Sequence, residues 1–259
     1  MRLNYKRKWI IIYLCKFEER GALCVFKGFK KETIQFFLDL RFHNSKAFMD
    51  ENRERYIKSV REVFYAFIED VGSRMQKLDE DLEIRPHKCL SRINRDIRFT
   101  KDKSPYRDHL WLIFHKAATD KDGMPNFWFE LGPDFTSWGM GTWGENRPMM
   151  DVMRRKMQAR PDDFVHLVEY LYKNDFSIGG NAWKKMPVPE NIPEVLRPLY
   201  LKKDLYISRN GVRVADALQK DIADKVYRDF EMLMPVYKML HGCVDEAMNQ
   251  LDEETGGKV

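Results

Sequence analysis

The chain has 259 residues, of which 44% are hydrophobic and 33% are charged. This composition excludes an intrinsically disordered or fibrous protein, and it is sufficient for a large buried core. The formal net charge of +5 at pH 7 is only mildly basic, so charge alone selects neither nucleic acid nor any other class of partner.

We expect no segment of the sequence to direct the chain to a membrane or out of the cell. The first apolar run, residues 9–14, is too short for a secretory signal and far short of a membrane span of about 20 residues. We expect residues 1–24 to be an extension outside the fold, and residues 25–259 to form a single domain. The four cysteines match no zinc or redox motif, so we expect reduced thiols, a cytoplasmic location and no membrane partner.

The N-terminal part of this domain is predicted to be helical. Apolar residues at steps of three and four predict a short helix over 34–42 and a second helix of about 30 residues from Phe48 to Leu78. Between them, Asn44 and Ser45 are typical of a turn and a helix N-cap.

From Lys88 onward the apolar period changes to two, which is typical of β-strands. Short turns separate the strands, so the predicted fold class is α+β, with an antiparallel meander sheet of about four or more strands packed against several helices. Helices follow Pro148 and Pro161, and two terminal helices are separated or kinked at Pro235. The expected strands are 88–99, 110–115, 126–131, 135–140 and 205–208, and 176–193 is expected to be a Gly- and Pro-rich connection.

The segment from Arg92 to Arg107 is rich in charged side chains of both signs. In an extended strand Arg92, Asp96 and Arg98 share one face, where guanidinium groups can bind a phosphate or carboxylate bidentately. The alternative is an internal lattice of ion pairs on an exposed sheet surface. The candidate ligand-binding residues are Arg92, Arg95, Asp96, Arg98, Lys101, Asp102, Lys103 and Tyr106.

The two acids of this segment have cationic neighbours in the sequence. Such neighbours favour the ionised carboxylate, so we expect neither Asp96 nor Asp102 to donate a proton near neutral pH. Each is expected to orient an Arg or Lys side chain for an anion. Because Asp102 lies in a predicted turn, we expect Asp96→Asn to lower the melting temperature more than Asp102→Asn.

The same segment reads R-x-x-R-D-x-R-F-T-x-D-K-x-P-Y and resembles the hallmark of the uncharacterised family called domain of unknown function 2461. The resemblance extends over 26–251, through stretches at 26–29, 44–56, 127–141 and 180–187. Phe48 and Met49 stand where the family usually has Trp and Phe, which affects packing detail. The resemblance implies a single α+β domain and no particular reaction.

Three other patterns have a structural explanation that we prefer. Gly139 to Gly144 satisfies G-x-G-x-x-G, but a dinucleotide site needs a surrounding βαβ unit, so tight-turn glycines are favoured. The histidines form no ligand pattern, and we expect neither a metal nor a cofactor. Tryptophan side chains near the basic segment can stack on bases, but packing on the sheet is favoured. These tryptophans are Trp111, Trp128, Trp138 and Trp143.

Three functions remain open. We rank first a protein or enzyme that binds a small anionic ligand, second a structural or partner-binding protein whose charged segment is an internal network, and third a nucleic-acid-binding module. A pocket beneath the segment favours the first over the second. An extended basic surface with exposed Trp or Tyr favours the third. The sequence leaves the reaction, the ligand and the oligomeric state open.

Overall fold

The computed structural model describes residues 26–99, 101–117 and 123–254. Within them, one sheet of five antiparallel strands has the order β1-β2-β3-β5-β4, which confirms the α+β class. The first three strands form the expected meander, and β5 and β4 extend it. The strands are β1 (Leu110–Phe114), β2 (Pro125–Leu131), β3 (Thr136–Thr142), β4 (Phe176–Gly179) and β5 (Tyr206–Arg209).

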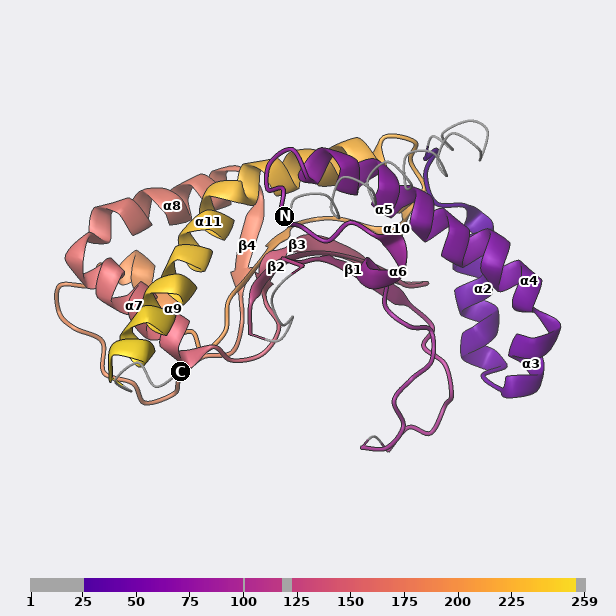
Figure 1. Cartoon of the computed structure of the whole chain (residues 1–259), viewed down its shortest axis with the longest axis horizontal. Coiled ribbons are helices and arrows are strands. Elements are labelled where there is room, and N and C mark those ends of the chain that lie inside the picture. The colour runs from indigo at the N-terminus through magenta and orange to yellow at the C-terminus, as the bar shows by residue number, and fades with distance from the viewer. Residues whose placement is uncertain (1–25, 100, 118–122, 255–259) are drawn as a thin grey trace, which may run out of the picture.

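Helices lie along one side of this sheet, and the sheet arches beneath them (Figure 1). The N-terminal helices are α2 (Lys31–Phe42), α3 (Lys46–Glu51), α4 (Arg53–Tyr56), the π-helical turn η1 (Ile57–Arg61), α5 (Glu62–Met75) and α6 (Pro86–Cys89). The C-terminal ones are α7 (Arg147–Ala159), α8 (Pro161–Lys173), the 3-10 turn η2 (Glu194–Leu196), α9 (Arg197–Tyr200), α10 (Val214–Ala217) and α11 (Ile222–Glu254).

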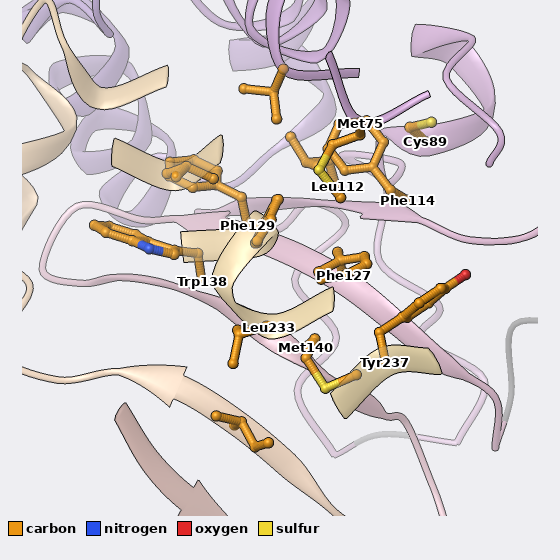
Figure 2. Packing of buried hydrophobic residues seen from close by; sticks show 14 of the residues in the cluster. Met75, Cys89, Leu112, Phe114, Phe127, Phe129, Trp138, Met140, Leu233 and Tyr237 are labelled. Carbon is orange, nitrogen blue, oxygen red and sulfur yellow. The ribbon is translucent and has the colours of Figure 1, made fainter. Parts of the chain in front are cut away.

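Aromatic side chains form the core between the sheet and the two longest helical stretches. Phe129 of β2 packs its ring 4.6 Å from that of Phe67 in α5, and Phe127 lies 4.8 Å from the ring of Tyr237 in α11. Figure 2 shows these strand residues beside Trp138 and Met140 of β3. Alternation along β1, β2 and β3 therefore buries the face of these strands that packs against the helices.

The predicted N-terminal helices are confirmed, with an interruption that the periodicity does not show. Ser45 caps α3 by accepting a hydrogen bond from the N–H of Phe48 at 3.2 Å. The expected helix of about 30 residues is divided among α3, α4, η1 and α5. The π-helical turn shifts the register of the buried stripe between Tyr56 and Val63, both of which are buried.

Two expectations about the C-terminal half need correction. Of the two alternatives at Pro235, separate helices are wrong, because α11 is continuous through it. Burial of Leu233 and Val236 on either side offsets the hydrogen bond that a proline removes. The connection expected over 176–193 contains β4, an edge strand that Phe176 anchors in the core.

No helix of the described residues is long and apolar enough to cross a membrane. The expected extension, residues 1–24, lies outside the described residues.

Candidate functional site

The charged segment forms an arm that projects from the sheet, and the expected strand over 88–99 is wrong. Residues 91–99 and 101–107, here called the arm, are two legs held by few backbone hydrogen bonds (Figure 1). The N–H of Arg95 donates to Pro105 O at 2.9 Å, and that of Arg107 to Ile93 O at 2.8 Å. No neighbouring strand of the described residues extends this ladder, so alternation in the sequence does not produce a sheet strand here.

Asn44 anchors the base of the arm. Its amide Nδ2 donates to Tyr106 O at 2.9 Å, and its Oδ1 accepts from the N–H of Tyr106 at 3.0 Å. This reciprocal pair copies the bonding of a neighbouring strand. Arg41, at the end of α2, bonds both Asp108 and Asp134 at 2.6 Å. Tyr106 was expected among the ligand-binding residues, and its burial makes it part of this anchor.

Cations and carboxylates pair with one another from Arg95, at the base of the arm, to Arg98 in its distal half. Arg95 forms an ion pair with Asp102, and Arg98 forms one with Asp96 at 2.7 Å. Lys103 Nζ donates to Ile97 O at 2.8 Å. The Arg98 side chain is 75% exposed, so its pair is well solvated. This half of the arm therefore agrees with the alternative of an ion-pair lattice.

Both acids of the arm are ionised near neutral pH, as expected. Hydrogen bonds from the Arg98 side chain and backbone lower the pKa of Asp96 to about 2. Hydrogen bonds from Ser104, followed by the charge of Arg95, lower the pKa of Asp102. Neither carboxylate can therefore act as a proton donor at neutral pH.

Arg107, at the base of the arm, has a different environment. Its guanidinium lies 4.7 Å from the centre of the Trp111 ring, and its Nη1 donates to Arg92 O at 3.1 Å and to Asn94 O at 2.9 Å. No carboxylate of the described residues forms an ion pair with it. Burial, and then the nearby charge of Arg95, lower the pKa of Arg107. The charge of Asp96 acts in the opposite direction, but it forms no ion pair with Arg107, so this fixed cation faces a second cation without a paired carboxylate.

Arg107 was missing from the residues expected to bind a ligand, although it closes the charged segment. A signal was available, because Arg107 and Trp111 have the same strand parity and a guanidinium stacks well on an indole. Of the expected cations, Arg92 and Lys101 also have no carboxylate partner within the described residues. Arg92, Arg95 and Arg107 therefore belong to the base of the arm, and Arg98, Lys101 and Lys103 to its distal half.

The sheet face opposite α5 and α11, here called the open face, borders the base of the arm (Figure 1). Trp111 and Trp128 are half-buried on it, and Tyr206 is 43% exposed. Trp138 instead points into the core and donates to Asp229 at 2.7 Å, whereas Trp143 is 79% exposed. Packing on the sheet therefore accounts for Trp138 and is wrong for Trp143.

Two aromatic rings of the open face lie on glycines. A Cβ at Gly139 would lie 2.7 Å from the Trp128 ring and 1.9 Å from Ile207 O, so no other residue fits. A Cβ at Gly179 would lie 2.2 Å from the Tyr206 ring. Gly139 is the first glycine of G-x-G-x-x-G. It is required because the backbone of Ile207 and the ring of Trp128 come too close to leave room for a side chain.

Acidic and imidazole groups also meet on the open face. His109 Nδ1 lies 3.0 Å from Asp108 Oδ1, and its Nε2 lies 3.6 Å from Glu130 Oε1. Burial raises the pKa of Glu130, which favours its neutral form. Among the described residues, no group of three His, Cys, Asp or Glu could hold a metal ion.

Comparison with known proteins assigns the chain to a family. The family model described as conserved hypothetical protein (DUF2461) matches residues 32–239, which include the arm and all five strands described above. This match is shorter at both ends than the resemblance expected over 26–251. A search of curated proteins finds no match. Because the matched residues make up most of the chain, the protein belongs to the DUF2461 family of conserved hypothetical proteins.

Proposed function

We propose that the protein binds the phosphate or carboxylate group of a small anionic ligand at the base of the arm. Arg107 is the principal contact, and Arg92 and Arg95 lie beside it. The observation that carries this proposal is the guanidinium of Arg107, which is held in place without a carboxylate partner among the described residues.

The position of Arg107 is fixed before any ligand arrives. One terminal nitrogen is held by two backbone carbonyls and the plane rests on Trp111, while Nε and Nη2 have no hydrogen-bond partner among the described residues. A guanidinium oriented in this way loses little conformational freedom when it binds an oxyanion.

Arg95 adds a second reason for an anion at this place. Its Nε is buried and has no hydrogen-bond partner within the described residues, which is costly for a charged group. Its charge also lies close enough to Arg107 to lower the pKa of Arg107. An anion near both guanidinium groups would relieve this repulsion, and Asp102 would orient Arg95 for the contact.

The distal cations have a supporting role in this proposal. Arg98 is paired with Asp96, and Lys103 with a backbone carbonyl. At the end of an exposed arm, such groups attract an anion over a distance of about 10 Å. The residues at the base of the arm then bind the anion tightly. The proposed location is the cytoplasm, which agrees with the buried thiols of Cys89 and Cys243.

The test is calorimetric titration of the full-length protein with inorganic pyrophosphate. Arg107→Gln should weaken binding by roughly tenfold or more, because it removes a charge-assisted contact. Arg98→Gln is the matched control, since it removes an equal charge from the distal half, and its effect should stay within about twofold. No binding to the wild type, or a larger loss for Arg98→Gln, would contradict the proposal.

A further inference from the structure

The three aromatic residues of the open face form a diagonal line across the sheet. Trp111 of β1 is opposite Glu130, and Trp128 is the residue two positions before Glu130 in β2. Trp128 is opposite Gly139 in β3, and Tyr206 of β5 is opposite Gly141, two positions further along β3. Diagonal neighbours of this kind are within reach of aromatic side chains, and the Trp128 and Tyr206 rings are 6.1 Å apart.

Glycines hold the rings of this line low on the sheet. Gly139 leaves room for the indole of Trp128, and Gly179 leaves room for the ring of Tyr206. Each ring covers its glycine, and the two rings meet edge to face, because their planes are 84° apart. An aromatic ring that lies over a glycine stabilises a sheet. This effect does not explain why three aromatic residues on three different strands form one line.

Cations lie at both ends of the line. Arg107 stacks on Trp111 at one end. At the other end, the chain before Tyr206 pairs with a second basic segment through the bridge between Ala182 and Lys202. There Lys203 Nζ lies 4.3 Å from the centre of the Trp183 ring. The exposed Lys184 and Lys185 follow Trp183, and of these lysines only Lys203 forms an ion pair with a described carboxylate, that of Glu145.

We infer that the open face binds single-stranded nucleic acid, which crosses the sheet along this diagonal. Bases stack on Trp128, on Tyr206 and on the face of Trp111 that Arg107 leaves uncovered, and phosphates contact Arg107 at one end and the lysines near Trp183 at the other. The inference rests on the proposed function for its first phosphate contact, and it extends the bound anion from a small ligand to one phosphate of a polymer.

The geometry selects a single strand over a duplex or a free nucleotide. Unpaired bases present a π-face to aromatic side chains, whereas a duplex hides these faces in its own stack. Adjacent strands lie about 4.8 Å apart, so the line from β1 to β5 spans about 14 Å and exceeds the contact that one base can make. A chain with several bases and phosphates fits both the row of rings and the cations at its ends.

The test is fluorescence anisotropy of the full-length protein with labelled oligothymidylate and oligouridylate of about 12 nucleotides, a length within the range that single-strand surfaces cover. Tyr206→Leu keeps an apolar cover on Gly179 and removes the aromatic face, so it should weaken binding at least about fivefold. Tyr172→Leu, at an exposed tyrosine of α8 away from the open face, is the matched control and should leave affinity within about twofold. Melting temperatures show whether either variant is folded.

The outcomes separate this inference from the proposed function. Binding of the single strands, with the loss in Tyr206→Leu alone, supports it. Equal affinity for a duplex of the same length, equal affinity for a mononucleotide, or equal losses in the two variants would overturn it. If pyrophosphate binds in an Arg107-dependent manner but no oligonucleotide binds, the inference fails and the anion site stands. If neither binds, both fail.

Discussion

Arg95 and Arg107 are close neighbours in the arm, yet their charges are balanced differently. Arg95 has Asp102 as its ion-pair partner, whereas Arg107 contacts backbone carbonyls and the face of Trp111 and feels the charge of Asp96 without pairing with it. The sequence places both in one charged segment and gives no sign of this difference. Pairing depends on how the two legs of the arm meet, which is a tertiary property that spacing along one leg does not specify.

The contacts of the two aspartates favour the order opposite to the one that the sequence suggests. Asp96 and Arg98 are both exposed, and such pairs contribute little to stability. Asp102 accepts from the N–H of Ser104 at 2.9 Å and pairs with Arg95, whose side chain is only 25% exposed. We now predict that Asp102→Asn lowers the melting temperature more than Asp96→Asn does at neutral pH. A larger loss for Asp96→Asn in paired thermal melts would refute this order.

The same prediction has a pH dependence of fixed sign. The folded-state pKa of Asp102 is below its ordinary value of 3.8, so its stabilising contribution is present above pH 3.8 and is lost as the pH falls through the folded-state pKa. The difference in melting temperature between the wild type and Asp102→Asn should therefore be constant from neutral pH to about pH 5 and shrink below about pH 3.8. A difference that grows on acidification would be inconsistent with an ionised Asp102.

At the scale of elements, the arm shows why a strand pattern is not sufficient for a strand. Ile93 and Tyr106 are buried at its base, but Ile97 and Phe99 are exposed. Alternation continues past the edge of the core, where no further strand supports it. The sequence predicts the helices better than the strands, because apolar residues spaced three and four apart mark the buried face of a helix. At Pro235 the sequence does not decide between two helices and one, and burial of the flanking residues accompanies the single helix α11.

Asn44 is the residue on which the attachment of the arm depends. Asn44→Ala removes both hydrogen bonds to the backbone of Tyr106 and leaves a part-buried N–H and C=O without partners, at a cost of about 1–3 kcal/mol in unfolding free energy. The amide proton of Tyr106 should also exchange faster. Asn52→Ala is the matched control, because its side chain makes one hydrogen bond, to Phe48 O within the same helical stretch. Equal losses in chemical denaturation of the two variants would mean that Asn44 does not anchor the arm.

At the scale of the whole molecule, the sequence is sufficient for the fold class and the β1-β2-β3 meander. It does not reveal that β5 lies between β3 and β4, because that order depends on pairing between segments far apart in the chain. The diagonal of Trp111, Trp128 and Tyr206 depends on the pairing register of the strands. The sequence does not specify that register for distant segments, so it does not predict the diagonal. The sequence shows tryptophans near the basic segment. Which of them face outward depends on where the helices cover the sheet.

The N-terminal boundary of the fold is the last prediction. Phe29 stacks 5.4 Å from Phe129, and Phe26 packs 5.0 Å from Phe67, so the described chain is part of the core from its first residue. A protein consisting of residues 25–259 should keep the melting temperature of the full chain. Phe29→Ala in either protein should cost about 3–5 kcal/mol through the cavity it leaves. A cooperative transition lost on truncation alone would place residues 1–24 in the core.

The most direct measurement of the central claim is the nuclear magnetic resonance of arginine side chains during a pyrophosphate titration. Arg107 Nε has no hydrogen-bond partner among the described residues, so an anion bound at the base of the arm should shift its Nε–H resonance in a saturable manner. The indole N–H of Trp111 should move with it, because the guanidinium rests on that ring. The Arg98 resonance should hardly change, since Arg98 stays paired with Asp96. Saturable shifts confined to Arg98, or no shift at Arg107, would contradict the assignment of the anion site.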